Sequence, residues 1–136
     1  MRVQTLVKTM ITAAAFVVAS QFAQVAQAFE ATKFDDAAFK AAQAAGGEIL
    51  VHVTAPWCPT CVSQHKSLSE IGKKPDYAKL SVFNVDFDSQ GDVWKGLKAN
   101  SQSTLIAFKG ATETGRLVGT TKADAIEALL QTTMKK

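Results

Sequence analysis

Two cysteines, Cys58 and Cys61, are the residues of this sequence whose type and spacing are best suited to chemistry. They are the only cysteines in the chain, and two residues separate them. Thiols at this spacing can close a small disulfide ring and reopen it without rearranging the rest of the fold. The pair is therefore suited to thiol–disulfide exchange, and the alternative is a static disulfide or an inert pair of thiols.

The residues around the cysteines predict how the sulfur atoms are held. The apolar, β-branched run 49–54 predicts a buried strand, which Pro56 and Trp57 end. A helix then begins near Cys58. This cysteine is expected at the exposed N-terminus of the helix, where the helix dipole and unpaired backbone N–H groups favour a thiolate. Cys61, one turn deeper, is expected to be shielded. Cys58 is thus the predicted nucleophile and Cys61 the predicted resolving thiol.

The segment from Trp57 to Cys61 resembles the active site of the thioredoxin superfamily, in which a Trp-Cys-x-x-Cys run lies between a central strand and the next helix. The resemblance extends from about Thr32 to Leu130 through the order of the predicted elements. It implies an α/β, thioredoxin-like fold with a mixed central sheet and helices on both faces. It also implies an enzyme, a thiol–disulfide oxidoreductase that acts on disulfide-containing proteins and needs no cofactor or metal.

Helices and strands alternate along the predicted chain. Asp35 is placed to cap the first helix, with Phe34 and Phe39 as a hydrophobic staple, and Thr121 is placed to cap the last one. The elements between these caps are a glycine stop at 46–47, the strand 49–54, a helix from 58 to 72, the strand 80–87, the helix 92–100, and a hairpin of strands 104–109 and 116–119. Residues 30–33 would supply the first strand of the family.

Two positions depart from the thioredoxin pattern. His52 stands where the family usually has a buried Asp beneath the resolving cysteine. A neutral imidazole there can accept the Cys61 proton, and the alternative is a core histidine satisfied by its neighbours. Ser103 stands where the family has a cis-proline that faces the disulfide. The bond between Gln102 and Ser103 is then either trans, with a reshaped substrate loop, or cis and held by its surroundings.

The resemblance also implies a substrate-binding surface. Trp57 is predicted to be an exposed aromatic side chain that contacts substrate and shields the thiolate, with packing against Pro56 as the alternative. Ser103 and Gly119 are expected in the same groove. For Gly119 the alternative is an ordinary glycine at the end of a strand.

The two residues between the cysteines, Pro59 and Thr60, bear on the direction of exchange. Pro59 has no N–H to offer the thiolate, and Thr60 carries no charge. Both features favour a fairly reducing potential, nearer the roughly −270 mV of thioredoxin than the roughly −120 mV of a dedicated oxidant. The predicted activity is therefore disulfide reduction, with electrons supplied by a membrane thiol–disulfide donor.

The first 28 residues predict an export signal. Arg2 and Lys8 flank the start of an apolar stretch, Met10 to Ala19, and Ala26-Gln27-Ala28 has the small-x-small pattern that a signal peptidase reads. Cleavage after Ala28 leaves one thioredoxin-like domain, residues 29–136, in the periplasm, where disulfides persist. A membrane anchor is the rival interpretation, but it needs about 20 apolar residues and this stretch is shorter.

Composition limits the remaining possibilities. The 15 basic and 12 acidic residues give a net charge of +3, which falls to +1 without Arg2 and Lys8. No basic run or interleaved aromatic pattern appears, so nucleic acid is not an expected partner. About 108 mature residues suffice for one domain with a single core, expected to be a monomer.

Two other classes of function stay open from the sequence. An exported copper or zinc carrier could use Cys58, Cys61 and His65, because His65 lies one turn beyond Cys61. A thioredoxin-like binding module without redox turnover is the other class, and it draws on the missing proline at position 103.

Overall fold

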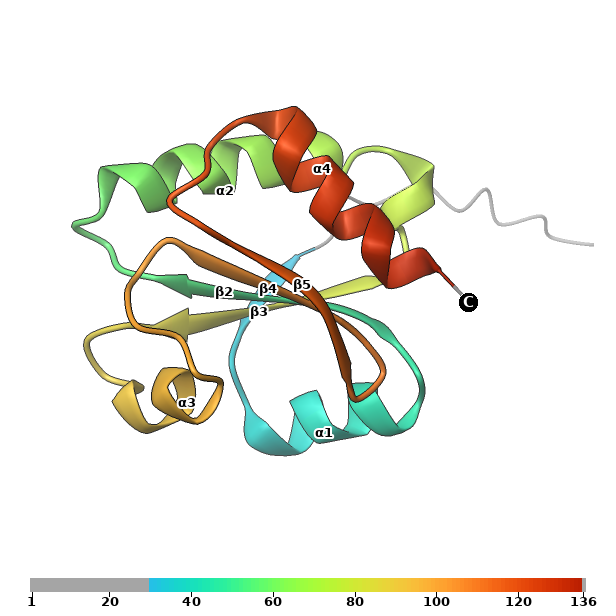
Figure 1. Ribbon diagram of the computed structural model, residues 1–136, viewed down its shortest axis with the longest axis horizontal. Helices are drawn as coiled ribbons and strands as arrows, with labels where there is room; N and C mark the ends of the chain where they lie inside the picture. The colour runs from blue at the N-terminus through green and yellow to red at the C-terminus, as the bar shows by residue number, and fades with distance from the viewer. Residues whose placement is uncertain (1–29, 136) are drawn as a thin grey trace, which may run out of the picture.

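The strand that precedes the cysteines, β2 (Glu48–Thr54), lies at the centre of a five-stranded mixed sheet (Figure 1). The computed structural model describes residues 30–135. The strand order is β1-β3-β2-β4-β5; β1 and β3 run parallel to β2, whereas β4 is antiparallel to β2 and β5 to β4. The other strands are β1 (Ala31–Lys33), β3 (Leu80–Asp86), β4 (Thr104–Lys109) and β5 (Thr112–Val118).

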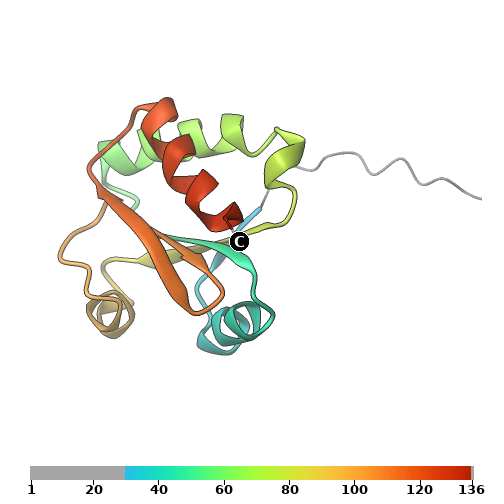
Figure 2. The ribbon, with the colours of Figure 1, turned by 45° about the vertical axis from the view of Figure 1, so that its right-hand side comes forward.

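In the described part of the chain, four α-helices cover the two faces of this sheet, two on each face (Figures 1 and 2). Helices α2 (Pro59–Ile71) and α4 (Ala123–Gln131) pack on one face, and α1 (Asp36–Ala44) and α3 (Gly91–Gly96) lie on the other. Short 3-10 helices follow α2 and α4, at Pro75–Tyr77 and Thr132–Met134. The predicted thioredoxin-like fold, a mixed sheet with helices on both faces, is confirmed.

The central strand divides the core into two halves. The five residues from Ile49 to Val53 have no exposed surface, and successive side chains point to opposite faces. Leu50 packs with residues of α2 and α4, whereas Val51 and Val53 pack with those of α1 and β3. His52 therefore faces the α2 side together with Leu50. This alternation brings an imidazole beneath the helix that begins at the cysteines.

The N-terminal part of the domain forms as its local signals predict. The Asp35 carboxylate accepts a hydrogen bond of 2.8 Å from the Ala38 backbone N–H and caps α1, and the Phe34 and Phe39 rings lie 5.1 Å apart, centroid to centroid. The helix ends at Ala44, just before the glycines at 46–47. Strand β1 is three residues long and pairs with β3, so the first strand of the fold is present.

Two predicted boundaries are wrong, the start of β5 and the end of α3. Strand β5 begins at Thr112 and not at Arg116, because Gly110, with a φ of +56°, turns the chain in so few residues that pairing resumes at once. Gly115 belongs to the strand and not to the turn; a Cβ atom there would lie 2.9 Å from Leu129 of α4. Helix α3 ends at Gly96, before Lys98 adopts a φ of +57°.

The predicted cap of the last helix is also wrong. Lys122, not Thr121, occupies the N-cap position of α4, and it makes no side-chain capping bond. The Asp124 carboxylate in the first turn accepts the Ala125 N–H at 2.8 Å and supplies the oxygen that a cap would have offered. Thr121 instead presents its carbonyl to the Ser67 hydroxyl of α2, so it joins the two helices.

The prediction about export falls outside the part of the chain that the structure covers. Residues 1–28, the proposed signal peptide, precede the described range. Within residues 30–135, no helix combines the length and the apolar character needed to cross a membrane.

Candidate active site

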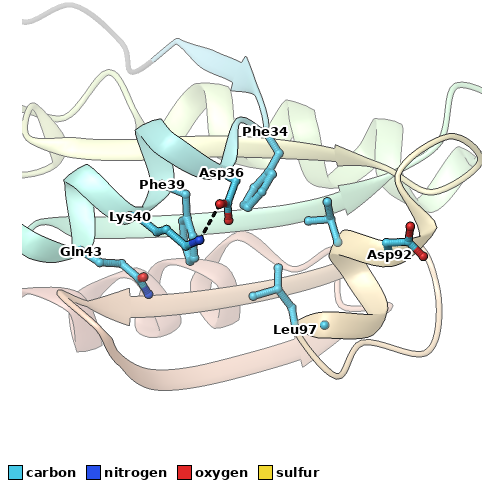
Figure 3. Close-up of a pocket in the computed structure, with 9 residues that line it drawn as sticks. Phe34, Asp36, Phe39, Lys40, Gln43, Asp92 and Leu97 are labelled. Carbon is cyan, nitrogen blue, oxygen red and sulfur yellow. Dashed lines mark hydrogen bonds and ion pairs between the residues drawn. The ribbon is translucent and has the colours of Figure 1, made fainter.

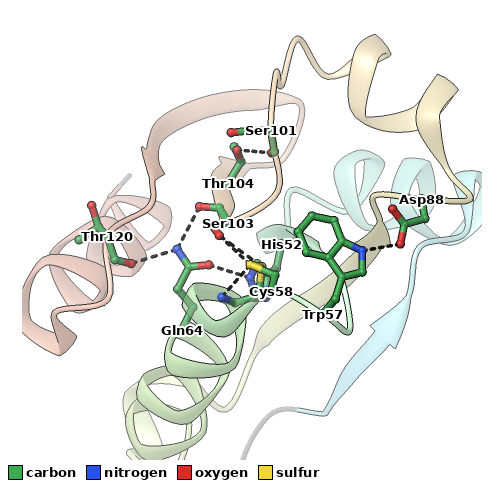
Figure 4. Close-up of a disulfide and its surroundings, with 10 residues drawn as sticks. His52, Trp57, Cys58, Gln64, Asp88, Ser101, Ser103, Thr104 and Thr120 are labelled. Atoms are coloured by element: carbon green, nitrogen blue, oxygen red, sulfur yellow. Dashed lines mark hydrogen bonds between the residues drawn. A yellow bond between two sulfur atoms is a disulfide. The ribbon is translucent and has the colours of Figure 1, made fainter.

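The two cysteines form a disulfide across the first turn of α2, at the end of the central strand (Figure 4). Cys58 is the N-cap residue, and its sulfur accepts a hydrogen bond of 3.1 Å from the backbone N–H of Cys61. Pro59 takes the first helical position, where a missing N–H costs nothing. The Cys58 sulfur therefore lies at the positive end of a helix, with one N–H already directed at it.

The burial of this sulfur pair corrects one expectation. Cys61 is 1% exposed, as its shielded position predicted, but Cys58 is only 3% exposed and was expected to be open to solvent. Both pack against Ala55 and Phe87. Ser103 lies over them from the loop before β4, and this long-range contact closes a site that the helix start alone would leave open.

The loop that carries Ser103 has trans geometry. Every peptide bond among residues 30–135 is trans, so the Gln102–Ser103 bond takes the first of its two alternatives. Ser103 has a φ of +61°, in the left-handed region that side chains other than Gly, Asn and Asp seldom adopt. Its hydroxyl oxygen lies 3.1 Å from the Cys58 sulfur and 3.3 Å from the Cys61 sulfur. The residue in place of the family's proline thus touches the disulfide itself.

The other two residues predicted to bind substrate flank this loop. Trp57 is 57% exposed, and its indole N–H donates to the Asp88 carboxylate at 2.8 Å, which fixes the ring beside the disulfide (Figure 4). Gly119 has a φ of +70° and donates its N–H to the Ser103 carbonyl at 2.9 Å. The structure brings both to the site, and their contact with substrate stays a prediction.

A buried histidine and a buried glutamine lie beneath the site. The His52 Nε2 atom is 2.9 Å from the Gln64 side-chain oxygen, and both residues are fully buried. The Gln64 amide nitrogen donates to the carbonyls of Ser103 and Thr120, at 3.0 Å each. These two bonds use both amide hydrogens and fix the amide orientation, because a carbonyl can only accept.

The amide orientation in turn fixes the tautomer of the imidazole. Since the Gln64 oxygen only accepts, His52 Nε2 carries the hydrogen, and Nδ1 keeps its lone pair. Nδ1 is buried and has no hydrogen-bond partner among residues 30–135. Burial lowers the pKa of His52 to about 4, and the neighbouring His65 adds to this shift. The result is an imidazole that is neutral near pH 7 and bonded through Nε2 to Gln64. The two interpretations of His52, as a proton acceptor and as a core histidine held by its neighbours, both stay predictions.

Gln64 is the residue of this site that the sequence did not reveal. It connects α2 to the loop before β4 and to the chain before α4, through segments 39 and 56 residues away. Glutamine in a helix is ordinarily exposed. The one sequence signal that could have marked Gln64 as buried is its position three residues after Cys61, on the face of α2 that packs on the sheet.

The residues proposed for metal binding form no cluster in the described chain. Both cysteines are joined in the disulfide, and the half-buried His65 ring lies 4.7 Å from the His52 ring, centroid to centroid. Within residues 30–135, no group of three or more His, Cys, Asp or Glu side chains is placed to hold an ion.

A hollow on the opposite face of the sheet is separate from this site. It encloses about 360 Å³ between α1 and α3, lined mainly by Phe34, Phe39, Val93 and Leu97, with the Asp36–Lys40 ion pair at its rim (Figure 3). It holds no cysteine or histidine, and none of its lining residues bonds to the disulfide. This hollow is therefore not part of the disulfide site.

A mixed sheet whose central strand leads into a helix capped by a disulfide defines the class: a thiol–disulfide oxidoreductase with the thioredoxin fold. Comparison with known proteins agrees. The family model described as Thioredoxin matches residues 25–132. The Thioredoxin H-type of Brassica campestris is 32% identical over 91 residues, 67% of this chain and 72% of that protein. Thioredoxin-2 of Saccharomyces cerevisiae is 29% identical over 107 residues, 77% and 95% of the two chains.

Solved structures give the same result. The crystal structure of Trxlp from Edwardsiella tarda superposes with a TM-score of 0.72 at 37% identity, over 74% of this chain and 98% of that one. A thioredoxin from Malassezia sympodialis, with a TM-score of 0.68 at 18% identity, shares the fold. The chain belongs to the thioredoxin family, whose members reduce disulfides in proteins.

We expect the buried imidazole to make the stability of the fold depend on pH. The His52 pKa is about 4 in the folded chain and about 6.5 when unfolded, so between these values only the unfolded chain takes up the proton. The free energy of unfolding should fall by about 2 kcal/mol between pH 7 and pH 5, above the range where carboxylates titrate. Urea denaturation at the two pH values measures this difference in the free energy of unfolding.

A matched pair of variants assigns this pH dependence. His52→Gln removes the titrating ring and should flatten the profile, whereas His65→Gln should keep most of it. Burial also lowers the pKa of His65, although this ring is only half-buried. A His52→Gln profile as steep as that of the wild type would show that the imidazole is not the group responsible.

Proposed function

We propose that this chain is exported and acts as a disulfide reductase, with Cys58 as the nucleophile and Cys61 as the resolving thiol. The observation that carries the proposal is the position of Cys58 as the N-cap of α2, where its sulfur accepts the Cys61 N–H. A hydrogen bond and a helix dipole both favour the charged thiolate over the thiol. The sulfur that most readily loses its proton is the one that attacks.

Reduction then proceeds in two exchange steps. The Cys58 thiolate attacks one sulfur of a substrate disulfide, which forms a mixed disulfide and releases the other substrate sulfur as a thiolate. Cys61 loses its proton and attacks the Cys58 sulfur. The Cys58–Cys61 bond forms, the second substrate thiolate leaves, and two electrons have passed to the substrate. Two electrons from a thiol donor in the membrane restore the dithiol.

His52 is our candidate for the base that accepts the Cys61 proton. Its Nδ1 lone pair is free, its tautomer is fixed by Gln64, and its low pKa keeps it neutral before the step. A neutral base differs from the carboxylate common in the family in one respect. Accepting the proton creates a buried positive charge, which makes uptake unfavourable and favours prompt release once the disulfide has formed, so His52 would hold the proton only transiently.

The direction of electron flow rests on the residues between the cysteines. Pro59 supplies no N–H and Thr60 no positive charge, so the thiolate receives less stabilisation than in a strong oxidant. The relatives that this chain matches are thioredoxins. This similarity supports reduction of substrate disulfides as the direction of exchange.

The mixed disulfide should accumulate when Cys61 is replaced. Cys61→Ser stops the second step but leaves the first, so covalent complexes with client proteins should appear on non-reducing gels of the exporting compartment and vanish with reductant. Cys58→Ser, with the other sulfur intact, is the control and should trap far less. Equal trapping by the two variants, or trapping only by Cys58→Ser, would reverse the proposed roles.

Export should be visible in the mass of the purified protein. Removal of the signal peptide leaves a chain that begins at Phe29, and osmotic release should free it from bacterial cells together with other periplasmic proteins. A variant with Ala26 and Ala28 replaced by bulky residues should keep its N-terminus. Intact mass spectrometry distinguishes these cases. A full-length chain retained in the cytosol would refute export but would leave the proposed thiol–disulfide exchange unaffected.

A further inference from the structure

The Ser103 hydroxyl lies against both sulfur atoms of the disulfide, and in a hydrogen bond to either sulfur it can only be the donor. Its oxygen is 3.1 Å from Cys58 Sγ and 3.3 Å from Cys61 Sγ (Figure 4). Sulfur atoms in a disulfide carry no hydrogen, so only the hydroxyl can donate. The residue is 5% exposed, which leaves little room for water to replace it.

Three hydrogen bonds to the backbone of Ser103 hold this residue in place. Its N–H donates to the Val53 carbonyl at 2.8 Å, and its carbonyl accepts from the Gly119 N–H at 2.9 Å and from the Gln64 amide at 3.0 Å. These partners belong to β2, the end of the β4–β5 hairpin and α2. They retain a φ of +61°, a backbone conformation that is unfavourable for a serine. The surrounding structure therefore fixes the position of the hydroxyl.

The acceptor strength of the sulfurs changes when the disulfide is reduced. A disulfide sulfur is a weak acceptor, whereas a thiolate carries a full charge, and a hydrogen bond to a charged group is roughly twice as strong as a neutral one. We propose that Ser103 is a catalytic residue whose hydroxyl donates a hydrogen bond to the Cys58 thiolate in the dithiol form. This inference rests on the proposed role of Cys58 as the nucleophile.

One hydroxyl can serve the two sulfurs in turn. It has one hydrogen to donate and two lone pairs, so in the dithiol form it accepts the Cys61 S–H while it donates to the Cys58 thiolate. Once Cys58 enters the mixed disulfide, its charge is gone and the hydroxyl hydrogen can turn to Cys61. The Cys61 proton passes to a base and not to Ser103, which keeps its own hydrogen. Cys61 then attacks Cys58 Sγ, and the substrate thiolate leaves.

The test is the pH profile of Cys58 alkylation by iodoacetamide in the reduced protein. Ser103→Ala and Ser103→Gly both remove the hydroxyl, but Ala keeps the backbone preferences of Ser, whereas Gly adopts positive φ freely. Ser101→Ala is the control, since it alters the same loop and keeps the Ser101 carbonyl that binds Thr104. The titratable side chains around the site, His52 on β2, His65 on α2 and Asp88 beside Trp57, are unchanged in all three variants.

We expect the two Ser103 variants to give the same result. The midpoint of the Cys58 profile should rise by about one pH unit, so alkylation below both midpoints should be about tenfold slower. The rates should converge at high pH, where every Cys58 is a thiolate. Ser101→Ala should follow the wild type.

Three outcomes would overturn the inference. If neither Ser103 variant shifts the profile, the hydroxyl does not stabilise the thiolate. If only Ser103→Gly shifts it, backbone freedom and not the hydroxyl is responsible. The third outcome is read from peptide mapping of the alkylated wild-type protein. If Cys61 is modified first, the proposed role of Cys58 is refuted, and the inference with it. Modification of Cys58 with an unchanged profile refutes the inference alone.

Discussion

One hydrogen bond, from the backbone N–H of Cys61 to the sulfur of Cys58, sets the chemistry of this protein. It exists because a buried strand delivers the chain to a helix start, and a helix start leaves N–H groups without partners. In most helices a serine, threonine or aspartate oxygen occupies this place. Here a sulfur does so, and the same interaction that caps the helix favours the ionised form of Cys58.

The polar groups beneath the sulfurs form one connected network. Gln64 joins His52 on β2 to the Ser103 carbonyl, and Ser103 in turn reaches both cysteines. Each bond limits the next: two carbonyls orient the Gln64 amide, the amide sets the imidazole tautomer, and the held carbonyl keeps the serine in a strained conformation. Such a network has few alternative arrangements, which suits a site where hydrogens must be placed at particular atoms.

The sequence predicts well what is decided locally. The strand before the cysteines, the helix after them and the Asp35 cap depend on residues within one or two turns, and the structure confirms all three. It predicts poorly what distant segments decide. The burial of Cys58 comes from a loop some 45 residues away, and the role of Gln64 depends on carbonyls 39 and 56 residues away. The side chain of Thr121 is of a type that caps helices, which led to the wrong prediction. In the structure the Thr121 carbonyl accepts a hydrogen bond from the Ser67 hydroxyl, and Thr121 is not the N-cap.

The proposed exchange depends most on ionisation of Cys58 ahead of Cys61 at the helix start. An NMR titration of the Cβ atoms of isotope-labelled cysteines in the dithiol form measures both groups in the same sample. We expect the Cys58 signal to titrate at least about one unit below the ordinary thiol value of about 8.5, and the Cys61 signal above that value. If Cys61 titrates first, or if both signals titrate near the ordinary value, the helix start does not control the exchange and Cys58 is not the nucleophile for the reason proposed.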